Sequence, residues 1–461
     1  MLPSSASTAW VLTSSALVML MIPGLGLFYA GMVKQEDLQA VMEQGVLSLL
    51  LVTLEWAVLG FSLSFSPGSP FLGGLSWAGL AGLGAQVQGP GIPMLAFAIF
   101  MGMFAAITPA LITGVFPTRV KAFTLTFFIL LWSLLVYDPV AHWVWGQGGW
   151  LRDMGMLDFA GGTVVHLNAG MAALAYAVYA RRRKRQPLPV TSVGNGSYLV
   201  LGALLLLFGW FGFNSGSALS ADGLAALAFV NTVLGAASAG LVWMIWGWKR
   251  DSPGVLESMQ GLVAGLVVIT PAAGFVTPSY AIVLGASGGL LTRLASSFRE
   301  RRKLADPLDV WGVHGVGGAW GALATGVFAT VGAEGLVAGN VVAVLVQAIG
   351  VLSVGAYSFV VSYVLIALLD GALGFEARRP EVLTAMQAHV PAPSAGKRQE
   401  SSSASSAPRP LRDYGSCPRI WHWIPCANHP HCTWMDLATA SPACLPSALG
   451  DKSLAGRPAH Q

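Results

Sequence analysis

The segment 158–180 reads DFAGGTVVHLNAGMAALAYAVYA, and a basic run at 181–185 follows it directly. From residue 161 onward the segment has about the 20 mostly apolar residues that a helix needs to cross a bilayer. An acid and an imidazole stand out in it, Asp158 at the start and His166 eight residues later. The same spacing returns at Asp306 and His314, where another apolar segment begins. We expect these two segments to lie at the centre of the fold.

Apolar segments of this kind recur along the whole chain, which has 461 residues, 54% of them hydrophobic and only 10% charged. A soluble domain is about 25% charged, so this chain lacks the polar surface that a soluble protein needs. The composition therefore indicates an all-α polytopic membrane protein in a lipid bilayer. It excludes a soluble enzyme, a nucleic-acid-binding protein and a β-barrel.

Eleven transmembrane helices are expected. The basic residues between them gather on one side of this arrangement, and only Arg152 lies on the other. Since Lys and Arg are enriched on the cytoplasmic side of membrane proteins, the N-terminus is expected outside the cell membrane and the C-terminus in the cytoplasm. The spans are roughly 8–33, 41–66, 92–115, 122–141, 161–180, 197–217, 224–247, 255–275, 280–297, 310–330 and 339–370.

The odd number of spans fits two inverted five-helix repeats plus a final helix. His166 lies in span 5 and His314 at the start of span 10, which runs in the opposite direction, and Asp158 and Asp306 each come eight residues earlier, just before the span. Eight helical residues cover about 12 Å, so each histidine is expected near the middle of the bilayer, reached from opposite faces. A midplane site between inverted repeats is a common plan for transporters.

Either histidine alone could equally be a structural residue bonded to a backbone carbonyl. The matched depth of His166 and His314 favours a functional pair, because ionisable groups inside spans usually line a path or pair with one another. A metal site would need a third ligand at the same depth, and the sequence offers none there. We therefore expect neither a metal nor a cofactor, and no enzyme, since the spans hold no HExxH motif and no paired catalytic carboxylates.

Acidic residues near the starts of the two segments are expected to cap helices. Asp158 can accept hydrogen bonds from free backbone N–H groups at the start of span 5, and it can also supply a negative field that favours a cation. Asp306 and Asp309 are expected to cap span 10 in the same way.

Six stretches together resemble the ammonium transporter family (Amt/MEP/Rh). The block 158–168 is the most specific of them, and the similarity runs in order over about residues 8–376. The other five are 21–31 (MIPGLGLFYAG), 209–217 (GWFGFNSGS), 228–232 (AFVNT), 269–272 (ITPA) and 309–318 (DVWGVHGVGG).

The resemblance implies a homotrimer in which each eleven-helix subunit has its own pore. Trp145, Phe104 and Ser217 match the family's outer ammonium site, and Phe104 and Phe213 match the stacked phenyl gate below it. Trp145 favours the Amt/MEP branch over the Rh proteins. Taken singly, each of these side chains could be an interfacial or packing residue. Together they suit a small cation, because aromatic faces attract it and a hydroxyl accepts its N–H.

The same resemblance assigns His166 and His314 to the pore lining and to proton relay, with Asp158 as the supporting acid. Moving a bare cation through the bilayer centre costs from about 3 to above 10 kcal/mol. Removing a proton from ammonium, whose pKa is about 9, costs roughly 3 kcal/mol near pH 7. We therefore expect ammonium or methylammonium to bind outside, lose a proton and cross in its neutral form, with the proton relayed separately.

The end of the chain departs from the family. The transmembrane domain is expected over 1–376 and a largely disordered cytoplasmic tail over 377–461, because the composition turns to Ser, Pro and Ala. The acidic stretch expected after Leu369-Asp370-Gly371 is missing, which weakens the case for PII-type regulators. The alternative function is an ammonium sensor of the same fold that signals through its tail, although the tail has too little apolar periodicity for a signalling domain.

Overall fold

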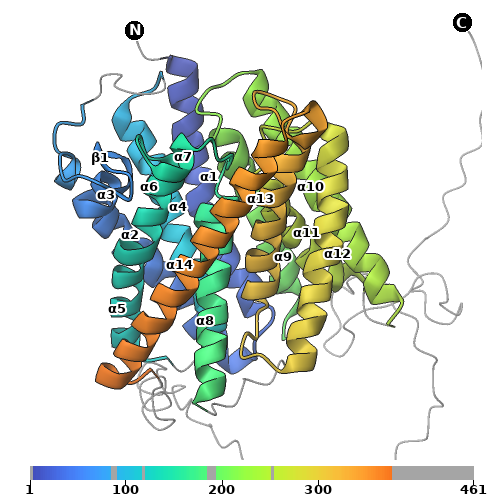
Figure 1. Ribbon diagram of the computed structural model, residues 1–461. Helices are drawn as coiled ribbons and strands as arrows, with labels where there is room; N and C mark the ends of the chain where they lie inside the picture. The colour runs from blue at the N-terminus through green and yellow to red at the C-terminus, as the bar shows by residue number, and fades with distance from the viewer. Residues whose placement is uncertain (1–3, 85–90, 117–119, 184–193, 251–253, 376–461) are drawn as a thin grey trace, which may run out of the picture. The chain divides into compact units, whose positions relative to one another are not determined.

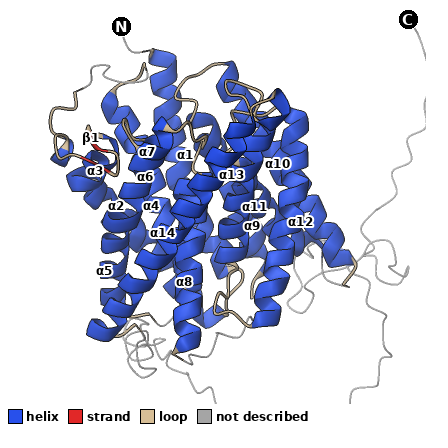
Figure 2. Cartoon of the chain, in the orientation of Figure 1, coloured by secondary structure: helices blue, strands red, loops and turns tan. Residues whose placement is uncertain are grey.

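The computed structural model describes residues 4–84, 91–116, 120–183, 194–250 and 254–375. These residues are predominantly helical (Figure 2). One small departure from the all-α prediction is an antiparallel hairpin of two short strands, β1 (Gly68–Ser69) and β2 (Leu72–Gly73). The predicted tail, 377–461, lies outside the described residues, so its predicted disorder stays a prediction.

Nine helical segments of the described residues are long and apolar enough to cross a membrane. They comprise α1 (Ser5–Ala30); η1 (Gln35–Asp37), α2 (Leu38–Glu55), η2 (Trp56–Gly60) and α3 (Phe61–Phe65); α4 (Met94–Ile112) and η4 (Thr113–Val115); α5 (Ala122–Trp132), η5 (Ser133–Tyr137), α6 (Asp138–Trp145) and α7 (Trp150–Asp153); η6 (Gly162–Leu167) and α8 (Asn168–Arg182); α9 (Gly196–Trp210) and η7 (Phe211–Ser215); α10 (Gly223–Trp248); α12 (Pro278–Arg302); and α14 (Val341–Leu373).

Two of the predicted spans correspond to shorter helices. The span predicted at 255–275 is α11 (Gly254–Ile269), which ends two residues before Pro271, and turns follow it. A proline lacks the N–H that would continue the helix, which explains the early end. The span predicted at 310–330 consists of η8 (Trp311–Val316) and α13 (Gly317–Phe328). The short helices η3 (Ala78–Leu80) and η9 (Leu336–Ala338) lie between longer ones.

The helices pack closely through small residues. α10 lies against α11 and α12, α1 lies against α9, and α14 crosses α8 (Figure 1). A Cβ atom added at Gly265 of α11 would lie only 2.3 Å from the carbonyl oxygen of Gly235 in α10. Such contacts between backbones are how helices associate where lipid removes the hydrophobic driving force.

The described residues hold five π-helical turns: η2 and η5 lie inside a helix, η7 follows α9, and η6 and η8 begin the helices that continue as α8 and α13. A π turn is rare, and it often marks a functional site. η6 holds His166, η7 holds Phe213 and η8 holds His314. The other two lie next to Glu55 and Asp138, since η2 begins directly after Glu55 and η5 ends directly before Asp138.

Candidate functional site

The imidazole rings of His166 and His314 lie against one another inside the helix bundle. Their Nδ1 atoms are 3.3 Å apart, and their ring centroids are 5.3 Å apart at an interplanar angle of 29°. The residues are only 1% and 3% exposed. Nε2 of His166 has no hydrogen-bond partner among the described residues. The structure thus brings together the two histidines that the repeated spacing singles out.

Glycines allow this approach. Gly170 and Gly318 each lie four residues after a histidine, one helical turn further along. A Cβ atom at Gly170 would lie 2.1 Å from the backbone nitrogen of Gly315, and one at Gly318 would lie 2.5 Å from the carbonyl oxygen of Gly162. Each histidine-bearing helix therefore presents bare backbone to the other, and the two contacts are reciprocal.

Asp158 caps the first of these helices, as expected. Its carboxylate accepts hydrogen bonds from the backbone N–H groups of Gly161, Gly162 and Thr163 at 2.7–2.8 Å, and also from the Thr163 hydroxyl. Burial raises the pKa of the Asp158 carboxyl, and these hydrogen bonds oppose the rise. The carboxylate is thus a fixed helix-terminal group whose oxygens are directed at backbone donors.

Asp306 plays the matching part for the second helix, but Asp309 does not. Asp306 accepts hydrogen bonds from the N–H groups of Val310 and Trp311 at 3.0 and 2.8 Å, which confirms the predicted cap. The prediction that Asp309 is also a cap is wrong. Its Oδ1 lies 2.9 Å from Nε of Arg299, and an ion pair with this buried guanidinium replaces the capping contacts.

A column of aromatic rings leads to the histidines. The Phe104 and Phe213 rings stack with centroids 4.0 Å apart at 20°, and Trp145 meets Phe104 edge-on at 6.2 Å. The Phe213 ring also lies 5.9 Å from the His166 ring at 26°. Phe104 and Phe213 are fully buried. The order of contacts is therefore Trp145, Phe104, Phe213, His166 and then His314.

Polar atoms at the Trp145 end of the column hold its geometry. The indole N–H of Trp145 donates to the carbonyl of Asp158 at 2.9 Å, which fixes the ring beside the capped helix start. The Ser217 hydroxyl, one turn after Phe213, donates to the carbonyl of Phe213 at 2.8 Å. A hydroxyl that donates in this way keeps its oxygen lone pairs available as acceptors.

Small cavities continue the path past the histidines. A cavity of about 10 Å³ lies beside both imidazoles, and a second of about 10 Å³ shares His314 and Val263 with it. Such a volume is about what one water-sized molecule needs. The lining of the first cavity is apolar except for the imidazoles and the indole of Trp210; it includes Met21, Leu25, Ile107, Leu111, Val165 and Phe213.

A third histidine, His142 in α6, shows what a structural histidine looks like in this fold. Its ring nitrogens contact the carbonyl oxygens of Ser64 and Ser69 at 3.0 and 2.8 Å, which ties α6 to the β1–β2 hairpin. His166 and His314 instead face each other. Among the described residues, no three His, Cys, Asp or Glu side chains gather as ligands of a metal ion.

The chain matches a known family of proteins over most of its length. A model of the Ammonium Transporter Family matches residues 9–383. The chain belongs to this family. It is 42% identical over 390 residues to ammonium transporter Amt1 of Archaeoglobus fulgidus, covering 82% of this chain and 96% of Amt1. It is 41% identical over 386 residues to the ammonium transporter of Bacillus subtilis, covering 81% of this chain and 94% of the relative.

Solved structures of Amt and Mep proteins share the fold. Mep2 of Candida albicans superposes with a TM-score of 0.76 at 33% identity, covering 82% of this chain and 88% of that one. A structure described as a sensor Amt protein superposes with the same TM-score at 28% identity, covering 82% of this chain and 96% of that one. The chain is therefore a multi-pass membrane protein of a transporter family.

In this ammonium transporter family member, the structure also pairs two acids from the predicted spans 41–66 and 122–141. Glu55 and Asp138 are 8% and 0% exposed, and their carboxyl groups lie within hydrogen-bonding reach of one another. The Ser133 hydroxyl donates to Glu55 at 3.1 Å. These buried acids come from α2 and α6, so the fold pairs two carboxyl groups that are far apart in sequence. The sequence signal was available, since an acid inside a predicted span is rare.

Proposed function

We propose that this protein takes up ammonium nitrogen by binding ammonium at Trp145, Phe104 and Ser217 and passing ammonia along the column of rings to His166 and His314. Methylammonium is the expected analogue substrate, since it offers the same cationic head. The proposal needs no cofactor, metal, nucleic acid, enzymatic reaction or PII-type partner.

The observation that carries the proposal is the pair of contacting imidazoles in an apolar cavity. A cavity of about 10 Å³ suits a single small neutral molecule and leaves no room for a hydrated cation. Two neutral imidazoles in contact can share one proton, since each has one donor and one acceptor nitrogen. Ammonia therefore crosses beside His166 and His314, and the imidazoles carry the proton that ammonium leaves behind.

The outer end of the column suits the first step. The Trp145 indole is held by its N–H bond to Asp158, so its face is available to a cation without further ordering. The Ser217 oxygen lies one turn from the stacked Phe104 and Phe213 rings and can accept an N–H bond. The fixed Asp158 carboxylate adds a negative field close to this place.

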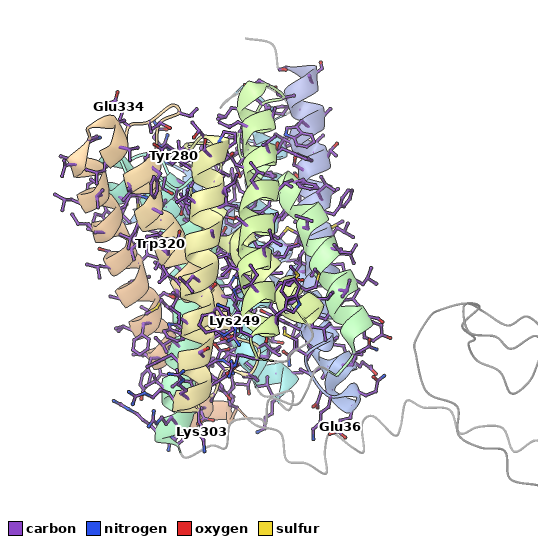
Figure 3. All side chains as sticks on the ribbon, turned by 90° about the vertical axis from the view of Figure 1, so that its right-hand side faces the viewer. Glu36, Lys249, Tyr280, Lys303, Trp320 and Glu334 are labelled. Atoms are coloured by element: carbon purple, nitrogen blue, oxygen red, sulfur yellow. The ribbon has the colours of Figure 1, made fainter. Side chains whose placement is uncertain are left out.

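We extend the proposal to the architecture. Eleven spans, with α11 and η8–α13 as the eighth and tenth, form two inverted repeats and a final helix, α14. The equal spacing of acid, histidine and glycine in η6–α8 and η8–α13 supports this arrangement. Lys303 lies at the opposite end of the bundle from Glu334 (Figure 3), and the positive-inside rule makes the Lys303 end cytoplasmic. The proposed assembly in the cell membrane is a homotrimer.

The test is to replace His166 or His314 by alanine and to measure ammonium-evoked charge movement in proteoliposomes. Each variant is expected to lose the current, because one imidazole alone cannot relay a proton to the other. Size-exclusion chromatography in detergent checks that the variants keep the assembly of the wild type. His422→Ala, outside the family match at 9–383, controls for the loss of a histidine.

A wild-type current in both alanine variants would leave the two histidines with a structural role only. If a variant loses the current and the assembly together, its methylammonium uptake is compared with that of the wild type at equal amounts of protein instead.

The similarity to a sensor Amt protein supports a second candidate, an ammonium sensor of the same fold. A sensor binds ammonium without moving it in quantity. Wild-type vesicles that bind methylammonium but accumulate none would favour the sensor, and accumulation above empty vesicles favours the transporter.

A further inference from the structure

A third, larger cavity opens beyond His314, at the mouth that faces away from Trp145. Its volume is about 100 Å³, enough for several water molecules. It shares five lining residues with the small cavity beside His314, so the two lie next to each other. Its lining is charged, unlike that of the first cavity, and includes Trp243, Glu257, Gln260, Arg293, Arg299 and Asp309.

Arg293 is the most unusual of these residues, because an arginine inside a transmembrane span is rare. It lies in α12 and is only 3% exposed. Its guanidinium carbon lies 5.2 Å from the centroid of the Trp243 ring and 5.8 Å from that of Trp246. Its Nε faces a carboxylate oxygen of Glu257 at 3.4 Å, and its terminal nitrogen donates to Ser297 at 3.2 Å.

A small cation binds well where an aromatic face and a carboxylate lie together. The outer mouth offers ammonium the Trp145 face and the Ser217 oxygen, and this second mouth offers the Trp243 face and the Glu257 carboxylate. In the second mouth, however, a cation of the chain itself already lies on the ring. The other two carboxylates that line this cavity, Asp309 and Glu300, are likewise paired with Arg299, at 2.9 and 3.6 Å.

We propose that Arg293 is a tethered cation that fills a second ammonium site, formed by Trp243 and Glu257, and thereby keeps ammonium from being retained at this mouth. The inference rests on the proposed transport function and adds a direction to it. Ammonium binds at the mouth with the open aromatic site and leaves at the mouth where that kind of site is filled. Arg293 then determines which mouth retains ammonium, without contacting either histidine.

The test replaces Arg293 by glutamine, which leaves Trp243 and Glu257 in place without the guanidinium. Uptake of labelled methylammonium is measured in right-side-out and everted membrane vesicles while unlabelled ammonium is varied on the opposite side of the membrane. In R293Q, ammonium at the Glu257 mouth is expected to inhibit uptake at concentrations about 2- to 30-fold lower than in the wild type, the range for one cation–π contact. Ammonium at the Trp145 mouth should act as in the wild type.

Two matched variants separate charge from shape. R293K keeps a cation on the same helix and should behave like the wild type. E257Q/R293Q removes the carboxylate that would hold ammonium, so its inhibition should return toward the wild-type concentration. Equal inhibition of the wild type and R293Q would overturn the proposal, and so would equal inhibition of R293Q and E257Q/R293Q.

A further variant covers the case in which R293Q does not assemble. E257Q keeps the guanidinium and removes its counter-charge, so ammonium should inhibit at the same or a higher concentration than in the wild type. Inhibition at a lower concentration would overturn the proposal. Failure of the transport function itself would appear separately, as no methylammonium uptake by the wild type when ammonium is absent from the opposite side.

Discussion

Replacing Gly170 by alanine should break the contact between the two histidines without altering either of them. The added Cβ atom would lie 2.1 Å from the backbone nitrogen of Gly315, where ordinary contact begins at 3.4 Å. The two helices must therefore separate by about 1.3 Å, and the Nδ1–Nδ1 distance would grow from 3.3 Å to about 4.6 Å, too long for a hydrogen bond. Overpacking of this kind costs about 1–3 kcal/mol, which a folded protein can tolerate.

The assay is ammonium-evoked charge movement in proteoliposomes, which should fall to the background of empty vesicles in Gly170→Ala. Gly355→Ala is the matched control, since Gly355 lies in α14 and the nearest atom to its added Cβ, Cγ of Met171, is 3.8 Å away. The control should keep the wild-type current. A normal current in Gly170→Ala, with the protein assembled, would refute the idea that proton relay needs the two imidazoles in contact.

Four further outcomes are expected. Trp145→Leu removes the outer aromatic face and should weaken the apparent affinity for ammonium roughly 2- to 30-fold, while Trp145→Phe should weaken it less; an unchanged concentration dependence in transport assays would leave Trp145 an interfacial residue. Burial, and then the nearby Asp309 carboxylate, raise the pKa of Asp306 to about 6 from the ordinary 3.8. The folded protein therefore binds this proton more tightly than the unfolded chain, so the free energy of unfolding should rise by up to about 3 kcal/mol as the pH falls from about 7 to 4. Melting curves of Asp306→Asn should lack this rise, and an identical pH dependence in both proteins would contradict the assignment. Glu55→Leu leaves the buried Asp138 carboxyl without its partner and should lower stability by about 1–3 kcal/mol, whereas Glu55→Gln can donate an N–H bond and should melt close to the wild type; equal melting of the two variants counts against the paired acids. A chain ended after Val390 lacks only residues beyond the family match and should take up methylammonium at close to the full-length rate, so lost uptake with normal delivery to the membrane would give the tail a role in transport.

The sequence predicted the contact of the two histidines, but not the end of every helix around them. The equal spacing from Asp158 to His166 and from Asp306 to His314 was enough to pair the histidines, because a periodic helix turns equal spacing into equal depth. The early end of α11 could have been predicted as well, since Pro271 lies inside the expected span.

What the sequence could not predict depends on side chains from distant segments. Asp309 looked like a second cap because it lies near a helix start, but the buried Arg299 takes its carboxylate instead. The partner of Glu55 lies on another helix, and nothing near Glu55 in the sequence indicates it. The π turns could not be predicted from the sequence either, since a single extra residue in a turn does not disturb an apolar run long enough to cross a membrane.

Two of those π turns, η2 and η5, lie inside a helix and divide it into two rotational phases, α2 from α3 and α5 from α6. One extra residue turns everything after it by about 100° relative to an uninterrupted α-helix. The face that meets lipid in α5 is therefore not continued by the same heptad positions in α6, and a single helical wheel drawn through 122–145 superimposes two different faces. Insertions and deletions of one residue should for the same reason be tolerated very unevenly along the chain. A residue lost within η6 or η8 would convert the turn to α-helical geometry and move His166 or His314 away from the other histidine, while a residue lost from a loop between helices would leave every face where it was.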